Sequence, residues 1–461
     1  MSVLCFLLIR KYYSVLVYGY SFCFYELHFC GYSSVISISL RVASFSSMAE
    51  RFDVLVQGIS EAQALSLLFA KTSNVPRPSD RYFAATRLGL CCCSTTLDAL
   101  IRATYELKID ELFDRITRRK AIEALGRRKD ARAVPALVNV LLCTDTEAVI
   151  NAIYALVRIG WSPSLEEHDR LLCLLDSNDV TLKRAVIQAF GRLSIQSSAS
   201  RSRIVELCTH ESALVSGASR ACLSRLYGQR SLMQPSLSQL TDLIAGKRRS
   251  AVIDIGDSGD QNLLFDLVKA PVSMTLRAKS FLQIVDADDL LQTAEIQRLF
   301  KRLLLDDPQL LDLSDEWQCG LDQEDIEQNL SHRDEARQYG AAVSLMRIDR
   351  NECLELIDSM QERLWSDYVT HYYLTCVIGL RNLREKSYLV RSALAETTPQ
   401  YAKSRIAAAW ACVQLQLDDQ LELLYELSTS SPWLPLRWTC QQAFGQLLDQ
   451  QQASGDRIVC C

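Results

Sequence analysis

The sequence predicts an all-α protein, an α-solenoid of HEAT or armadillo type made of stacked helical hairpins. Composition and an internal repeat both predict this class. The 461 residues include only 17 Gly and 10 Pro, about half the usual share, and a chain so poor in turn formers is unlike a β-sandwich or barrel. Hydrophobic residues make up 49% of the chain and charged residues 23%, which is enough apolar surface to bury a core.

The repeat has a period of about 32 residues. Each copy has a basic residue, small and apolar residues at helical spacing, and often a terminal Gly; the aligned alanines are Ala124, Ala155, Ala189 and Ala221. This period fits two helices of about 12 residues and two short loops. One hairpin cannot bury its apolar face alone, so neighbours must stack. We expect the repeat glycines to end helices in the left-handed conformation: Gly126, Gly160, Gly191 and Gly445.

Composition also divides the chain. Residues 1–47 hold 11 aromatic residues and four charges, and they predict a non-native or disordered leader before a true start at Met48. A membrane span or a secretory signal fits less well, because the charge-free runs are short and interrupted by Tyr and Ser. The remaining predicted segments are an N-terminal solenoid (48–302), an acidic irregular connection (303–336), C-terminal HEAT-like repeats (337–448) and a polar tail (449–461).

Charge and cysteine usage exclude several function classes. A net charge of −5 does not favour nucleic-acid binding, which needs clustered Lys and Arg. The 17 Cys are odd in number, mostly scattered among apolar residues, and form no CxxC pair. We therefore expect a reduced cytoplasmic chain with no structural metal, no transmembrane segment and no tightly bound cofactor.

The window Trp365–Tyr373 is the candidate catalytic region. Asp367 and His371 are spaced i,i+4 within an expected helix, and Tyr368 and Tyr372 form a second such pair. Residues at this spacing share a helix face, so an acid–base pair would lie beside aromatic rings that pack on an organic ligand. The alternative interpretation is an aromatic repeat core with an Asp–His pair at its edge.

Basic residues near helix starts are candidates for binding ligand carboxylates. Arg81 and Tyr82 follow Asp80 in the first turn of an expected helix, and the most basic short runs contain Arg118, Arg119 and Arg248. Guanidinium groups bind carboxylates well. The alternative is that these residues are solvated or pair with acidic residues of the neighbouring repeat.

Three segments carry a resemblance to a known family: SDRYFAATRLG (79–89), TRRKAIEALGRRKDARAVPALVNVL (117–141) and NAIYALVRIG (151–160). Together with the opening MAERFDVLVQGISEAQAL at Met48, they resemble the HEAT-repeat phycobilin lyases of cyanobacteria, in particular the phycoerythrin-directed lyases and lyase-isomerases. The resemblance covers about residues 48–448. The leader has no counterpart in it.

The resemblance implies that the chain attaches phycoerythrobilin, its substrate, through a thioether to a cysteine of a phycoerythrin alpha subunit. Some family members also isomerise the bilin to phycourobilin. The resemblance leaves open whether a partner lyase subunit is needed. Arginines would then hold the bilin propionates, and the aromatic residues Tyr82 and Tyr372 would pack on its rings. Asp367, assisted by Tyr368 and His371, would protonate the bilin. The alternative function is a non-catalytic HEAT-repeat chaperone or scaffold for phycobiliprotein maturation.

Overall fold

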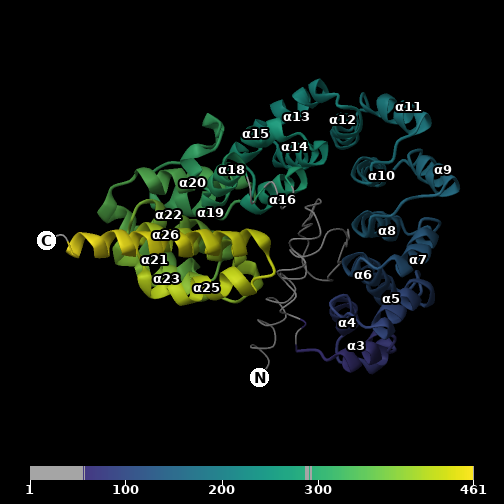
Figure 1. The fold of residues 1–461 in the computed structure, drawn as a ribbon, viewed down its shortest axis with the longest axis horizontal. Coiled ribbons are helices and arrows are strands. Elements are labelled where there is room, and N and C mark those ends of the chain that lie inside the picture. Colours follow the sequence, from purple (N-terminus) through teal and green to yellow (C-terminus); the bar gives the residue numbers. More distant parts are fainter. Residues whose placement is uncertain (1–55, 57, 286–289, 291–292, 460–461) are drawn as a thin grey trace, which may run out of the picture. The chain divides into compact units, whose positions relative to one another are not determined.

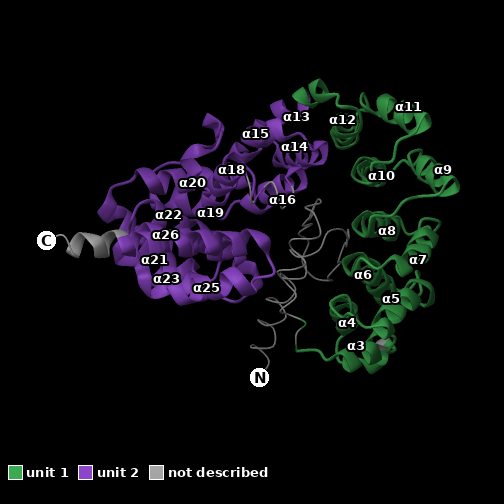
Figure 2. Cartoon of the chain, viewed as in Figure 1, with its two compact units in different colours: residues 1–234 green, residues 235–461 purple. Residues whose placement is uncertain are grey.

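The computed structural model describes residues 56, 58–285, 290 and 293–459, with side chains as far as residue 452. This part of the chain contains α-helices and short 3-10 helices and no strand, which confirms the all-α prediction (Figure 1). Within it, no helix combines the length and the apolar character that crossing a bilayer requires. The predicted leader, residues 1–47, and Met48 lie outside the described residues. The chain divides into two compact units, residues 1–234 and 235–461 (Figure 2).

Unit 1 is a regular stack of helical hairpins in two layers (Figure 1). The first helix of each hairpin lies in one layer: α3 (Glu61–Leu68), α5 (Ser94–Glu106), α7 (Val134–Val140), α9 (Leu165–Leu174) and α11 (Ser198–Leu207). The second helices form the other layer: α4 (Asp80–Leu88), α6 (Leu112–Arg128), α8 (Thr146–Ile159), α10 (Val180–Arg192) and α12 (Ala213–Tyr227). Each second helix packs against the next one, from α4 through α12. One continuous apolar core extends from Ala64 to Leu223.

Unit 2 begins in the same way and then becomes less regular. Its helices are α13 (Gln234–Ser238, which spans the boundary), α14 (Ala245–Ser258), α15 (Leu264–Lys269), α16 (Met274–Ile284), α18 (Ala294–Leu305), α19 (Gln323–Leu330), α20 (Glu335–Arg347), α21 (Arg350–Leu364), α22 (Tyr368–Leu380), α23 (Ser387–Ala395), α24 (Ala402–Leu415), α25 (Leu421–Ser430) and α26 (Leu434–Val459). The stack α22–α24–α26 restores the hairpin pattern, while α18 packs across α24 and α26.

The segment 303–336 is more ordered than the irregular connection that we expected. It contains the end of α18, two 3-10 helices (Pro308–Leu310 and Asp315–Trp317) and α19. Asp307 caps the first 3-10 turn, and the side chain of Asp322 accepts the N–H of Asp325 at the start of α19. Acidic residues in this segment thus act partly as caps, because a carboxylate satisfies the unpaired N–H groups at a helix start.

The repeat glycines have a different role from the predicted one. Of the four predicted glycines, only Gly160 ends its helix with a positive φ, of 78°, whereas Gly126, Gly191 and Gly445 lie inside helices. A Cβ on Gly126 would lie 2.7 Å from the Cα of Ala155 in the next second helix. Gly126 is therefore needed for close packing between repeats, which a sequence pattern cannot distinguish from a helix end.

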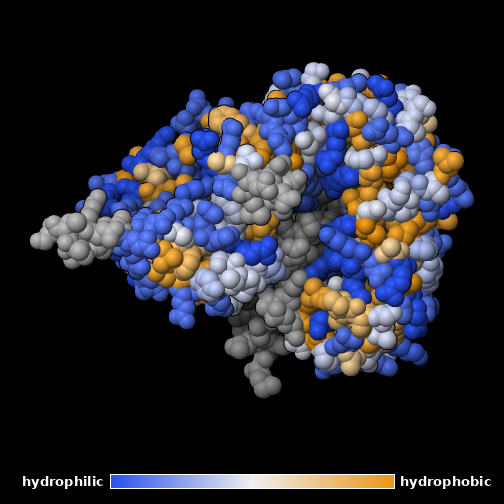
Figure 3. All heavy atoms as spheres, in the orientation of Figure 1, coloured by the Kyte–Doolittle hydropathy of each residue, from blue (hydrophilic) through white to orange (hydrophobic). Residues whose placement is uncertain are grey.

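Basic residues of successive repeats pair with acids at the starts of other second helices. Arg81 on α4 pairs with Asp114 on α6 at 2.5 Å, and Arg119 on α6 donates to Asp145, the N-cap of α8, at 2.9 Å. Arg81 and Arg119 thus bind acids of the neighbouring repeat, as the alternative interpretation expects. Apolar side chains also reach the visible surface of both units (Figure 3), and Leu165 is the most exposed of the large ones described, at 86%.

Candidate functional site

The candidate catalytic window lies at the start of α22 in unit 2. Asp367 is the N-cap of that helix rather than a residue within it, and its Oδ1 accepts the N–H groups of Val369 and Thr370 at 3.1 and 2.8 Å. A short acidic side chain before an apolar run is a strong helix-start signal. Asp367 therefore stands directly before the first helical residue, and its carboxylate is engaged with the backbone N–H groups of the first turn.

His371 faces a pocket of about 320 Å³ between the end of α21, the start of α22 and the segment before α24. The pocket is lined by Gln361, Glu362, Arg363, Trp365, Ser366, His371, Glu396 and Tyr401. Glu362, Arg363 and Ser366 are exposed and form its rim, whereas His371 is only 2% exposed and forms its floor.

Aromatic rings hold the imidazole in place. The ring centroid of Trp365 is 3.9 Å from that of His371, and the ring centroid of Tyr401 is 4.8 Å from it. Tyr401 is itself fixed, because its hydroxyl donates to the Ser366 carbonyl at 2.7 Å. The Nδ1 of His371 is buried and has no hydrogen-bond partner among the described residues. Such an atom is costly unless a ligand or water satisfies it.

The pocket holds a neutral imidazole beside a carboxylate. Burial lowers the pKa of His371 to about 4, against the opposing effect of the Glu396 carboxylate. Partial burial works to raise the pKa of Glu396, but hydrogen bonds from Thr398 lower it overall. At neutral pH His371 can therefore accept or donate one hydrogen bond without charge, while Glu396 is ionised.

Tyr372 points away from this pocket into a buried polar network. Its hydroxyl donates to Asp306, which also accepts from Tyr339 at 2.8 Å and pairs with Arg277. Arg277 is fully buried and donates further to the Val272 carbonyl at 3.0 Å. Burial, followed by the Asp306 charge, raises the pKa of Tyr372 well above its usual value. Tyr372 therefore anchors α22 to α16, α18 and α20 as a neutral phenol.

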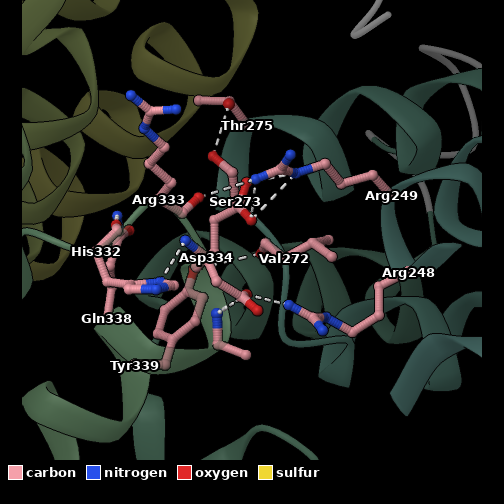
Figure 4. Close-up of polar contacts among 12 residues, drawn as sticks. Arg248, Arg249, Val272, Ser273, Thr275, His332, Arg333, Asp334, Gln338 and Tyr339 are labelled. Atoms are coloured by element: carbon pink, nitrogen blue, oxygen red, sulfur yellow. Dashed lines mark hydrogen bonds and ion pairs between the residues drawn. The ribbon is translucent and has the colours of Figure 1, made fainter. Parts of the chain in front are cut away.

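Arg248 lies in a second polar cluster of unit 2 (Figure 4). It is fully buried, pairs with Asp334 at the N-cap of α20, and stacks 4.6 Å from the centroid of Trp317. The neighbouring Arg249 pairs with Glu335 at 2.6 Å. These contacts join α14 to α20 across 86 residues of sequence.

The other predicted bilin-binding residues lie in unit 1, each with a partner inside the fold. Arg81 is 2% exposed and bound to Asp114, and Tyr82 lies under the ammonium group of Lys120 at 5.1 Å. Arg118 is 5% exposed and donates to the Thr104 carbonyl at 2.8 Å. Arg119 is bound to Asp145, as described above. None of these four residues is among those that line the His371 pocket.

Of the residues that line the pocket, sequence reasoning gave a role only to His371. The missed residues that act on its imidazole are Trp365, Glu396 and Tyr401. Trp365 is inside the window we singled out, but its stacking on His371 depends on the bend between α21 and α22. Tyr401 follows His371 by 30 residues, close to one repeat period, so the repeat itself was a signal that the two could be neighbours.

Comparisons with known proteins place these features in context. Residues 117–143 match the family model described as PBS lyase HEAT-like repeat. The chain is 26% identical over 361 residues to the "Uncharacterized phycocyanin operon protein Y" of Pseudanabaena tenuis, covering 77% of this chain and 85% of that protein. It is 25% identical over 387 residues to the "Bilin biosynthesis protein CpeY" of a Synechococcus species, covering 80% and 89%.

Among solved structures, the complex of CpcE and CpcF of phycocyanin lyase from a Nostoc species aligns with 22% identity and a TM-score of 0.45, covering 53% of this chain and 93% of that one. The chain is thus an all-helical solenoid that contains a HEAT-like repeat of the PBS lyase type and is similar over most of its length to a bilin biosynthesis protein.

Proposed function

We propose that this protein is a bilin lyase that attaches phycoerythrobilin through a thioether to a cysteine of a phycoerythrin alpha subunit. The observation that carries this proposal is the similarity to CpeY, a bilin biosynthesis protein, along 80% of the chain. The HEAT-like PBS lyase repeat at residues 117–143 supports the same class.

In the proposed reaction the acceptor thiol adds across the exocyclic ethylidene double bond of the bilin. A carbon–sulfur bond forms, the carbon–carbon double bond becomes single, and the thiol proton is balanced by the proton added to the bilin. No oxidant or reductant is needed. The nucleophile belongs to the acceptor protein, so this chain has to bind the bilin, orient it and move a proton.

Asp367, Tyr368 and His371 remain the proposed proton-transfer group. Asp367→Asn tests it well, because Asn caps a helix about as well as Asp but cannot donate a carboxylic proton. We expect this variant to fold normally and to lose bilin transfer. Near-normal transfer by Asp367→Asn would remove Asp367 from the proposed mechanism and leave its capping role.

The decisive experiment is co-expression of the full chain with a phycoerythrin alpha subunit and an enzyme pathway that makes phycoerythrobilin. Colour that stays on the alpha subunit after denaturation indicates a covalent bond, and the matched controls omit this chain or replace the acceptor cysteine by Ala. An absorption maximum shifted to that of phycourobilin would show that isomerisation accompanies attachment. A repeat with a second lyase subunit tests whether a partner is required.

A non-catalytic scaffold for phycobiliprotein maturation is the second candidate. Specific observations favour it: Asp367 caps a helix, and Arg81, Arg119 and Arg248 are bound to acids within the fold. A scaffold predicts that the alpha subunit binds this chain but gains covalent bilin only when another lyase is supplied.

A further inference from the structure

The pocket at His371 is too small for a whole linear tetrapyrrole. Sites for drug-sized ligands have volumes of about 300–1,000 Å³, and this pocket, at about 320 Å³, lies at the lower limit. It can take one ring of a larger ligand while the rest lies outside. We propose that it is a subsite for one terminal lactam ring of the bilin, an inference that rests on the proposed function.

The aromatic lining suits a flat ring. Trp365 and Tyr401 contact the imidazole of His371 at centroid distances of 3.9 and 4.8 Å. Both rings are held by the fold, since Trp365 ends α21 and the Tyr401 hydroxyl is bound to the Ser366 carbonyl. An entering planar ring would pack against surfaces that are already ordered, so little conformational entropy is lost on binding.

The polar floor selects a ring that carries an N–H donor. The Nδ1 of His371 is buried without a hydrogen-bond partner among the described residues, in a side chain that is 98% buried. In a neutral imidazole this atom carries either a lone pair or an N–H group. With its proton on Nε2, the imidazole keeps a lone pair on Nδ1, and that lone pair accepts the N–H group of a lactam.

The charges around the pocket determine which end of the bilin enters. Glu362 and Glu396 line it, and the guanidinium group of Arg363 at the rim is already paired with Glu327. These carboxylates repel the propionates carried by the two central rings of a linear tetrapyrrole. The terminal lactam rings are uncharged, so they meet no such repulsion, and the propionates stay outside.

Binding of phycoerythrobilin to the purified full chain, without an acceptor subunit, tests the subsite by titration of the bilin absorption band. His371→Phe keeps an aromatic ring but removes Nδ1, so we expect Kd to rise at least about tenfold, the loss of roughly one hydrogen bond. His371→Asn retains a side-chain acceptor and should stay within about threefold of the wild type. His210→Asn in unit 1, outside the pocket, is the matched control and should leave Kd unchanged.

A single-ring probe gives a test that does not depend on the folding of a variant. A pyrrolinone lactam should compete with the bilin for the wild-type protein, and its N-methyl derivative should compete at least about tenfold less well, because it lacks the N–H donor. Equal competition by the two lactams, or wild-type affinity in a folded His371→Phe variant, would overturn the subsite. If either of these two results is found and covalent transfer still occurs in co-expression, the subsite is rejected and the proposed lyase function is kept. Selective lactam binding without covalent transfer rejects the lyase and leaves the subsite.

Discussion

At the scale of single residues, two side chains four positions apart make different contacts within the fold. Asp367 satisfies the first N–H groups of α22, while His371, one turn later, is buried against Trp365 and Tyr401. The capping bonds define where the helix begins and therefore which side of it carries His371. Loss of the cap would move the imidazole as well as weaken the helix.

Burial of His371 predicts a dependence of stability on pH. The pKa of the imidazole is about 4 in the folded protein, against the ordinary value of 6.5 that applies to the unfolded chain. As the pH falls from 6.5 to 4, the unfolded chain binds a proton at His371 that the folded protein does not bind. The contribution of His371 to the free energy of unfolding is therefore fully present above pH 6.5 and is lost as the pH falls below that value. At 1.36 kcal/mol per pKa unit the loss approaches roughly 3 kcal/mol.

Urea unfolding of the wild type and His371→Phe at pH 7 and pH 5 measures this effect. The variant should lose less stability between the two pH values than the wild type. Burial raises the pKa of Glu147 to about 7, which changes stability in the opposite direction, but Glu147 is common to both proteins and cancels in the comparison. Equal pH dependence of the two proteins would show that His371 is not protected from protonation.

At the scale of helices, the repeat depends on close contacts between small residues. Gly126 fits against Ala155, and in unit 2 Gly379 fits against Ala411, where an added Cβ would lie 2.8 Å from the Ala411 Cβ. These contacts let adjacent second helices approach more closely than larger side chains allow. The spacing of the helices is thus set by the smallest residues in the sequence.

Gly126→Ala should destabilise the protein by about 1–3 kcal/mol, because the new methyl group meets the backbone of α8 and overpacking has costs of this size. Gly445→Ala is the matched control: Gly445 lies inside α26 with nothing within 4 Å of the added Cβ. There we expect a gain of about 0.5–1 kcal/mol from helix propensity. Thermal and urea unfolding of both variants provide the measurement.

The fold class could be predicted from the repeat period and the aligned alanines. A small residue such as Ala124 or Ala155 is found at the equivalent position of successive repeats, where neighbouring second helices touch. The role of the glycines was predicted wrongly, because Gly126 inside a helix and Gly160 at a helix end both follow the same repeat pattern of small and apolar residues. The pocket could not be assembled from sequence, because Trp365, His371 and Tyr401 come from three elements. His371 itself was found, because an aromatic window with one histidine is uncommon in this chain.

At the scale of the molecule, the two units differ in net charge and in how far apart in the sequence their contacting residues lie. Residues 1–234 contain 28 Lys and Arg against 21 Asp and Glu, whereas residues 235–461 contain 22 against 34. The net charge of −5 therefore conceals a basic unit and an acidic one. Unit 1 is joined mainly by neighbouring hairpins, but in unit 2 Arg277 reaches Tyr339 across 62 residues.

Asp306→Asn should loosen unit 2 selectively. Asn keeps the left-handed backbone of residue 306, where φ is 51°, but leaves the buried Arg277 without its counter-charge, at a cost of about 3–5 kcal/mol. Hydrogen exchange followed by mass spectrometry should show faster exchange in α16, α20 and α22, and no change in α6 and α8.

Asp130→Asn, which removes the exposed pair with Arg132 in unit 1, is the control and should leave exchange in α16, α20 and α22 unchanged. A uniform increase across both units after Asp306→Asn would instead mean that the two units unfold together.

The hairpin stack of unit 1 has a mechanical consequence. Because each second helix packs chiefly against the next, a load along the stack is divided among many similar joints, and each joint turns only slightly. Small rotations between neighbouring repeats therefore add up, and a longer stack bends more easily than a shorter one. The close contact at Gly126 makes one of those joints stiff, so curvature changes should concentrate at joints that lack so tight a fit, as at Gly191, where an added Cβ would lie 3.5 Å from the nearest atom.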